Sequence, residues 1–526
     1  MEILIISILS AAVVLPMMMV NRVFLPSDNK IQLSIVDQIR SNNHRFILKH
    51  GSFLFCEKMI YPQFLFWLLS FLSMKNYKRA ARYLFVLFHF LSAVAFIAFV
   101  LKLYPMMSPI IDLSLSEVLL YTGAVYILTP FSYNINNAKN TGISTRGLGL
   151  FLGQVVLYST VLYIYSNDMS YLILSSLCMW LILIGSAFSL QMLLLVIPAW
   201  AIIEGDWIVA APLLGALVFF FMTTPRYALN YVTGQFSFKI FYFKYLAKNI
   251  LLTKRYSVWR DFIWDFWKIA FNKFRHNGRI TKGLMYIYDN PAVTVIIGVP
   301  FCILIITLEW SIASYNGIKI VEHWRWLVSL PILLCFGAFI LTSFRLTRFL
   351  GEPERYVEFA TGLIAVASLS WFRMAPELVT YVLVFCAILT IVQLIGIRLR
   401  LKEKSQPGFF DDILQLEDYF EKNEPGTVRI LSNNNQISKL MISEKRQVFF
   451  GWPYSAKIGS FHFTEIYKSD QYLKADKIVV VAKEFQIDYF VLDKEDLSPN
   501  DPMFAKEGIF EHIAEHNELG LYKIRK

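Results

Sequence analysis

Charged side chains are scarce in this sequence. Asp, Glu, Lys and Arg make up 17% of its 526 residues, whereas soluble domains usually carry about 25%. Hydrophobic residues make up 56%, which is too many for a string of water-soluble domains of this length. The composition predicts a polytopic α-helical membrane protein instead.

Cysteine is also rare, with five residues in the whole chain, and none of them forms a CxxC pair. A disulfide framework and a cysteine-ligated zinc site are therefore not indicated. Residues 405–526 contain no glycine-rich phosphate loop, no Walker motif and no cluster of metal-ligating residues. This part of the chain is therefore predicted to be a regulatory or docking module, not a second catalytic centre.

Long apolar runs are what the sequence does contain. A membrane-spanning helix needs about 20 mostly apolar residues, because its backbone polar groups must be satisfied within the helix. About twelve runs are candidates, with one long tilted helix as the alternative for the two that meet near 186–191. The runs are 3–20, 60–74 (short), 83–103, 118–133, 148–165, 171–188, 190–203, 207–222, 293–310, 327–344, 357–372 and 379–397.

The net charge of +11 is unevenly distributed. Residues 223–290 hold twelve Lys or Arg against three Asp, interleaved with aromatic residues. Nucleic-acid binding is the less favoured interpretation, and a cytoplasmic segment at the interface with anionic lipid is the favoured one. The basic loops all follow even-numbered spans, which predicts that both termini are cytoplasmic and that the loop 21–59 lies outside.

The first loop and the C-terminal region each have a predicted secondary structure. In the loop 21–59, apolar residues at helical spacing predict one or two short amphipathic helices on the outer membrane surface; they are Ile31, Ile35, Val36 and Ile39. Residues 1–400 form the predicted transmembrane domain, and 405–526 a small soluble α/β domain. Its predicted elements are a helix at 409–420 and strands at 428–432, 447–450, 477–481 and 487–492.

An acidic residue lies just outside the first predicted span. Pro26-Ser-Asp28 opens the amphipathic stretch that ends in Ile39-Arg40, and Tyr61-Pro62 opens the next span. This layout resembles the GT-C superfamily of membrane glycosyltransferases. Ser144-Thr-Arg146-Gly before the fifth span and Ile487-Asp-Tyr-Phe-Val-Leu-Asp near the C-terminus are also similar to that superfamily.

The resemblance implies transfer of a sugar from a polyprenyl-phosphate-linked donor to a cell-surface glycan or lipid acceptor, in the bacterial inner membrane. It also implies a general base in the first outer loop, where Asp28 is the matching position and Asp37 the reserve. A carboxylate there can take the proton of an acceptor hydroxyl. Asp28 is equally suited to capping a helix, and Gln32 stands where related enzymes often have His.

Cations near this acid would stabilise the leaving phosphate. The candidates for binding substrate or lipid phosphate are Arg40, His44, Arg45 and Tyr61, with Glu352 and Arg355 between spans ten and eleven as a second cluster. The second cluster is also consistent with a charged turn that follows Pro353. No cofactor is firmly implied, and a divalent cation at the acidic pair Glu204 and Asp206 is an open alternative.

Two other functions compete with the glycosyltransferase hypothesis. A transporter or flippase of lipid-linked sugars would usually show inverted repeats, and the sequence shows no internal repeat. A non-catalytic scaffold in polysaccharide assembly would lack an essential acid in the outer loop. In all three cases the partners are membrane lipid and a glycan or lipid-linked sugar, with no nucleic acid.

Overall fold

The computed structural model describes most of the chain in segments. The described residues are 27–54, 59, 61–129, 143, 145–241, 291–305, 323–344, 347, 350, 353–404, 409–449, 466–467, 472–501, 504 and 508–525. The first predicted span at 3–20, Glu352 and residues 242–290 of the basic segment lie outside this set.

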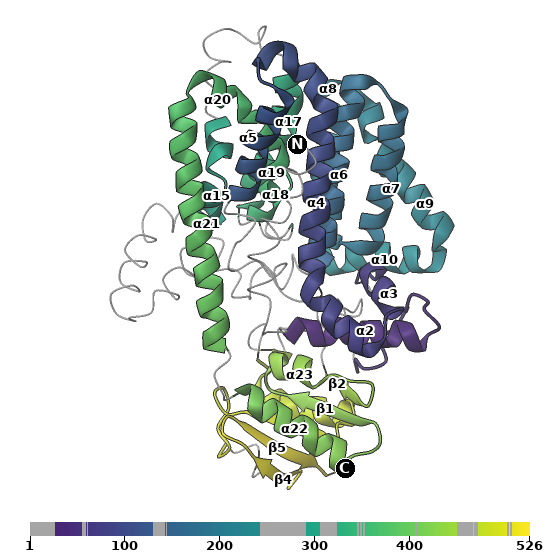
Figure 1. The fold of residues 1–526 in the computed structure, drawn as a ribbon. Coiled ribbons are helices and arrows are strands. Elements are labelled where there is room, and N and C mark those ends of the chain that lie inside the picture. The colour runs from purple at the N-terminus through teal and green to yellow at the C-terminus, as the bar shows by residue number, and fades with distance from the viewer. Residues whose placement is uncertain are drawn as a thin grey trace. The chain divides into compact units, whose positions relative to one another are not determined.

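The chain divides into two compact units that do not follow chain order (Figure 1). One, here called the helical unit, comprises Met1–Val23, Arg79–Thr223 and Arg255–Lys404. The other, the mixed unit, combines Phe24–Lys78, Thr224–Lys254 and Ser405–Lys526. Segments almost 400 residues apart in sequence therefore fold together in the mixed unit.

The helical unit consists of apolar helices. In its described part, four of them are long and apolar enough to cross a membrane: Val86–Pro109 within α4 (Met74–Ile111), α6 (Thr145–Ser166), α8 (Ala187–Glu204) and Pro376–Ile395 within α21 (Pro376–Lys404). α7 (Met169–Gly185) and α8 are separate helices that meet at Ser186. The remaining helices are α5 (Leu115–Leu128), η3 (Trp207–Ala210), α9 (Ala211–Thr223), α15 (Pro291–Gly298), α17 (His323–Thr342), α18 (Glu354–Glu358), α19 (Thr361–Ala367) and α20 (Leu369–Met374).

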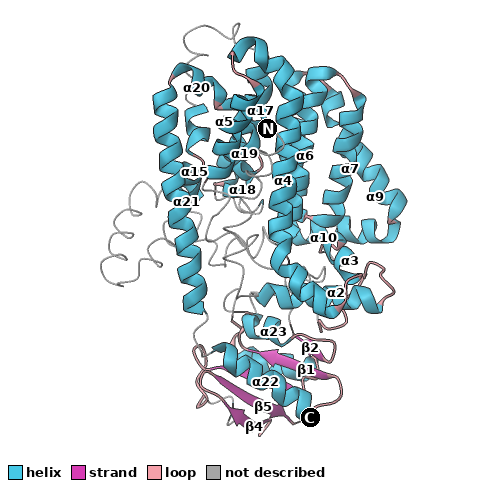
Figure 2. Ribbon diagram, viewed as in Figure 1, coloured by secondary structure: helices cyan, strands magenta, loops and turns pink. Residues whose placement is uncertain are grey.

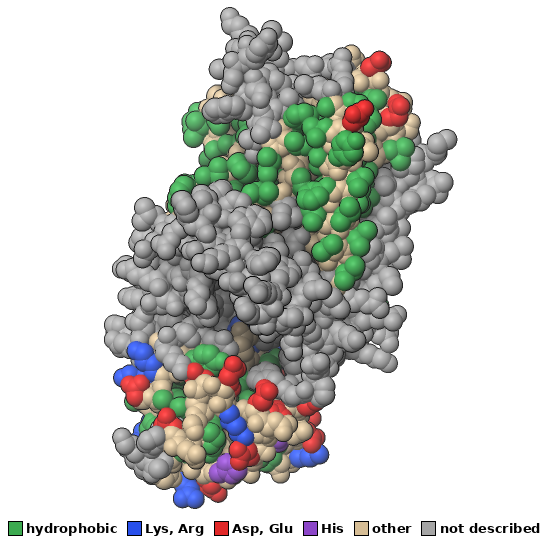
Figure 3. All heavy atoms as spheres, turned by 90° about the vertical axis from the view of Figure 1, so that its left-hand side faces the viewer, with side chains coloured by type: hydrophobic (Ala, Val, Ile, Leu, Met, Phe, Trp, Pro, Cys, Tyr) green, Lys and Arg blue, Asp and Glu red, His purple; other side chains and the backbone are tan. Residues whose placement is uncertain are grey.

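The surface of this unit suits lipid. Along α21, large apolar side chains are exposed at helical spacing: Tyr381, Val384, Phe385, Ile388, Ile391 and Ile395. Figure 3 shows hydrophobic side chains gathered over this face of the unit. A continuous apolar stripe of this kind marks a lipid or protein contact, and it supports the predicted membrane-embedded α-helical fold. The total number of spans in the chain stays a prediction.

The interior of the helical unit is tightly packed around α6. Tyr158 on α6 stacks on Phe99 of α4, with ring centroids 4.6 Å apart. Gly362 on α19 lies against the Tyr158 hydroxyl and Phe96, so that a Cβ atom there would meet both side chains. Glycine is therefore required at this position by the close approach of two helices.

Replacing Gly362 with Ala should destabilise the helical unit by about 1–3 kcal/mol, because extra atoms in a packed core force side chains from their rotamers. Gly337→Ala on α17 is the matched control, since its added Cβ would meet nothing within 4 Å. Thermal unfolding in detergent would measure both. Equal unfolding temperatures for the two variants would contradict the packing described around Tyr158.

The mixed unit contains the sheet of the protein (Figure 2). Its strands are β1 (Val428–Ser432), β2 (Arg446–Val448), β3 (Tyr489–Asp493), β4 (Phe510–Glu515) and β5 (Leu519–Ile524), in the order β2-β1-β3-β5-β4. β1 is parallel to β2 and β3, whereas β5 is antiparallel to β3 and β4. The helices are α2 (Ser27–Ser41), α3 (Phe64–Ser70), α10 (Pro225–Phe241), α22 (Phe409–Asn423), α23 (Asn435–Met441) and α25 (Ala475–Glu484).

The described part of residues 409–525, here called the C-terminal domain, contains helices and the sheet as predicted, with two differences. The predicted helix at 409–420 and strands near 428, 447 and 487 are present, but 477–481 is part of helix α25. Ile478, Val481 and Ala482 are buried at helical spacing, while Val480 is exposed. The run of β-branched residues suggested a strand and masked the helical spacing of the buried positions. Strands β4 and β5 were not predicted.

The second predicted span, at 60–74, is wrong. Its place is taken by α3, which has seven residues and is about 10 Å long, far short of a bilayer core of about 30 Å. Removing this span from the predicted series leaves eleven. The shortened series then predicts that the residues after the first span and those after Thr223 lie on the same side of the membrane.

Direct contacts contradict part of the predicted topology. The Val448 amide in β2 donates to the Ser52 carbonyl at 2.8 Å, and the Leu54 amide donates to the Val448 carbonyl at 3.0 Å. The Tyr227 hydroxyl on α10 donates to the Tyr61 carbonyl at 3.0 Å. An outer loop 21–59 and a cytoplasmic C-terminal domain cannot both exist, because the two are hydrogen-bonded. The loop, the start of the basic segment and the C-terminal domain belong to one folded unit.

Candidate functional site

The site is built on helix α2, the amphipathic helix predicted in the first loop. Its apolar residues Ile31, Ile35, Val36 and Ile39 are fully buried, and the helix packs against α3 and α23. Burying this face decides which side of the helix packs against its neighbours. Its remaining faces, which carry polar side chains, are thereby directed at two neighbouring cavities.

The chain reverses direction just after α2. Asn43 and His44 have φ angles of 52° and 56°, a left-handed conformation that is uncommon for residues other than glycine. The Ser70 hydroxyl donates to the Trp67 carbonyl and so accepts from His44 Nδ1, at 2.7 Å. Arg40 Nε donates to the Ser70 carbonyl at 3.0 Å. Arg40 and His44 therefore hold the C-terminal end of α3 against α2.

Buried polar groups fix the loop that follows. The Gln63 side chain exchanges two hydrogen bonds of 2.8 Å with the backbone of Ile47. His50 is completely buried; its Nδ1 accepts from the Ser52 amide at 3.2 Å, and its Nε2 donates to Ser34 Oγ at 3.1 Å. Burial lowers the pKa of His50 to about 3, so the ring is neutral and its two nitrogens hold a single tautomer.

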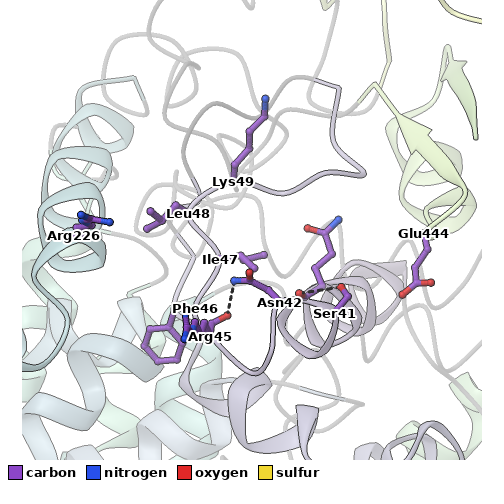
Figure 4. A pocket seen from close by; sticks show the side chains of 10 residues that line it. Ser41, Asn42, Arg45, Phe46, Ile47, Leu48, Lys49, Arg226 and Glu444 are labelled. Atoms are coloured by element: carbon purple, nitrogen blue, oxygen red, sulfur yellow. Dashed lines mark hydrogen bonds between the residues drawn. The ribbon is translucent and has the colours of Figure 1, made fainter.

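The first cavity lies beside this loop and has a volume of about 790 Å³. Three cations and one carboxylate line it, which makes it suited to an anion. Figure 4 shows Arg226, from α10, and Glu444, from the C-terminal domain, on opposite sides of the loop that carries Arg45 and Lys49. The full lining is Gln38, Ser41, Asn42, Arg45, Phe46, Ile47, Leu48, Lys49, Arg226 and Glu444.

The second cavity, of about 660 Å³, lies between α2 and the C-terminal domain. Lys30, Ser34 and Asp37 line it from α2, at the spacing that puts them on one face of a helix. The C-terminal domain contributes residues from 420 to 446, among them three glutamates. Glu444 lines both cavities, so the cationic cavity and the cavity that holds Asp37 adjoin each other.

The predicted site residues of the first loop lie in different parts of the mixed unit, some at the two cavities and others against neighbouring helices. Asp28 is the second residue of α2, and its side chain lies outside the described part of the structure. Asp37 lines the second cavity and Arg45 the first, whereas Arg40 and His44 contact α3. Tyr61 provides the carbonyl that Tyr227 binds. The structure thus brings the loop residues into one unit, and of their described side chains Asp37 and Arg45 are the ones that line either of these two cavities.

The other predicted clusters lie in the helical unit. Arg355, on α18, has its guanidinium 5.5 Å from the ring centroid of Phe188, and Pro353 directly precedes that helix. Asp206 accepts from the Ile208 amide at 2.9 Å and so caps η3. Among the residues that the structure describes, no group of three His, Cys, Asp or Glu is placed to hold a metal ion.

Several cavity residues were not predicted from sequence. Lys49 carries the same signal as Arg45, a cation in the first loop, and was overlooked. Arg226 and Glu444 could not have been found, because they come from α10 and from the turn before β2, far away in sequence. Only the tertiary fold brings these three segments together.

Comparison with known proteins supports the fold assignment. The sequence matches no protein-family model, and no curated protein matches it. The structure is similar to that of ArnT from Cupriavidus metallidurans, which was crystallised bound to undecaprenyl phosphate. The match has a TM-score of 0.51 at 12% sequence identity and covers 99% of this chain and 97% of ArnT. The protein therefore has the GT-C-like fold that its sequence indicated.

Proposed function

We propose that the protein is a membrane glycosyltransferase that moves a sugar from a polyprenyl-phosphate-linked donor to a glycan or lipid acceptor. The observation that carries this proposal is the first cavity, where Arg45, Lys49 and Arg226 surround an open volume within a GT-C-like fold. Three cations against one carboxylate favour a phosphate group. The adjoining second cavity offers space for an acceptor beside Asp37.

The proposed reaction needs one base and several cations. A carboxylate of the first loop, Asp28 or Asp37, takes the proton of the acceptor hydroxyl as its oxygen forms a bond to the anomeric carbon. The bond from that carbon to the phosphate oxygen breaks, and the polyprenyl phosphate leaves with the electron pair. Arg45, Lys49 and Arg226 stabilise the negative charge that develops on the leaving phosphate.

The cations supply the test. Replacing Arg45 or Arg226 with Met should weaken binding of undecaprenyl phosphate about 10- to 100-fold each, since a hydrogen bond to a charged group contributes about 1.5–3 kcal/mol. The matched control is Arg525→Met, which removes an exposed cation that pairs with Glu511 at 3.3 Å in the C-terminal domain and lies at neither cavity. Binding would be measured on the protein in lipid nanodiscs.

Two results would contradict the proposal. Equal binding by the Arg45, Arg226 and Arg525 variants would remove the first cavity as the phosphate site. Wild-type protein that binds undecaprenyl phosphate, yet moves the lipid-linked sugar across a bilayer without transferring it, would favour the flippase alternative.

A further inference from the structure

The C-terminal domain holds helix α2 through a shared carboxylate. Glu417 on α22 accepts from Lys30 Nζ of α2 at 2.6 Å and from Arg446 Nη2 of β2 at 3.3 Å, both at the same oxygen. The Glu417 and Arg446 side chains are 15% and 9% exposed, and that of Lys30 is 38% exposed. Glu417 therefore links α2 to the sheet at a largely buried point, where ion pairs are screened less than at a surface.

A second contact holds the chain after α2. Residues 51–54 run parallel to the edge strand β2, with Phe53 opposite Val448. Hydrogen bonds join Val448 to Ser52 and Leu54 through the backbone, and Gln447 Nε2 donates to the Gly51 carbonyl at 3.2 Å. The first loop thus pairs with the edge strand of the sheet through a single parallel β-bridge, a small version of the edge-strand pairing by which many proteins bind peptides.

These two contacts flank the residues of the proposed site. The segment between Lys30 and Ser52 carries Asp37, Arg45 and Lys49. Lys30 and Asp37 are seven residues apart, about two helical turns, and line the same cavity. Because a helix rotates as a rigid rod, the ion pair at Lys30 also sets the direction in which Asp37 points.

We propose that Glu417 is a positioning residue: acting through Lys30, it fixes the rotation of α2 and so aligns the carboxylate and cations of the first loop. The C-terminal domain is then a structural part of the transferase site. This inference rests on the proposed function for its effect on catalysis. The anchoring of α2 itself is a property of the fold and is measured separately.

The test compares Glu417→Gln and Lys30→Met with Asp418→Asn in full-length protein in nanodiscs. Asp418 is the neighbouring residue of α22 and pairs only on the surface, with Lys422 at 2.6 Å. Glu417→Gln and Lys30→Met should each make the α2 amides exchange hydrogen about tenfold faster. They should lower kcat about tenfold with little change in KM for the lipid-linked donor. Asp418→Asn should match wild type in every measurement.

Two further variants separate positioning from simple stability. Lys30→Arg keeps the ion pair and should restore kcat, and the double variant Glu417→Gln/Lys30→Met should be no slower than either single one. Lys30→Met leaves Arg446 paired, so it stays informative if Glu417→Gln fails to fold. Unchanged exchange of α2 in both single variants would overturn the proposal. If wild type shows no transfer, the proposed function fails, and the exchange data still decide whether Glu417 anchors α2.

Discussion

Sugar transfer should fall about a hundredfold or more when Asp28 is replaced with Asn, while the protein stays folded and inserted. General-base catalysis typically contributes 10²–10⁴-fold, and an amide of the same shape cannot accept the acceptor's proton. Asn is also as good as Asp at capping a helix. The variant therefore removes the proposed chemistry while keeping the alternative, structural role of this residue near the start of α2.

Asp37→Asn is the necessary companion, measured in membranes for consumption of the polyprenyl-linked sugar with protein level checked by blot. Asp37 lines the second cavity. If Asp28→Asn is fully active, Asp37 is therefore the next candidate for the general base. A hundredfold loss in only one variant would identify the base. Full activity in both variants would refute a carboxylate base in the first loop and favour the transporter or scaffold hypotheses.

The sequence was sufficient to predict helices and buried faces that show a clear local periodicity of apolar residues. The buried face of α2 was predicted from Ile31, Ile35, Val36 and Ile39, and these residues are fully buried. The long apolar helices and most of the C-terminal domain were predicted for the same reason. Where two periods overlap, as in the β-branched stretch that forms α25, the local pattern was ambiguous and the prediction failed.

Topology failed through one short run. Residues 60–74 are apolar enough to suggest a span, but Gln63 and Trp67 bind the backbone of the first loop at Ile47 and His44, so α3 completes the mixed unit. A single false span reverses the side assigned to everything after it. The charge pattern could not reveal this error. The basic loops were still all assigned to one side of the membrane, as the positive-inside rule expects.

The cavities were beyond sequence reasoning for a different reason. Arg45 was recognised because it lies near Asp28 in the chain, but Arg226 and Glu444 meet it only through the tertiary fold. The same local reasoning favoured Arg40 and His44, which instead contact Ser70 of α3. Proximity in sequence therefore selected the right loop, but it did not separate residues that line the site from those that support it.

Acid should destabilise the mixed unit through His50. Its folded-state pKa of about 3 lies below the ordinary value of 6.5, so between these values the unfolded chain binds a proton that the folded chain does not. Stability is therefore fully present above pH 6.5 and is lost as the pH falls toward 3, at about 1.4 kcal/mol per pH unit. Between pH 6.5 and 4.5 the loss should reach about 3 kcal/mol.

His50→Gln tests this directly, because a neutral amide cannot take up the proton. Thermal unfolding between pH 7.5 and 4.5 should show a steeper decline for wild type than for this variant. His512→Gln, at an exposed histidine of β4, should keep the wild-type slope. Because His50 binds both α2 at Ser34 and the chain at Ser52, its protonation should also loosen the first loop and weaken binding of undecaprenyl phosphate. If the stability of wild type and of His50→Gln falls equally with pH, protonation of His50 does not lower the free energy of unfolding. The first loop is then held by its other contacts.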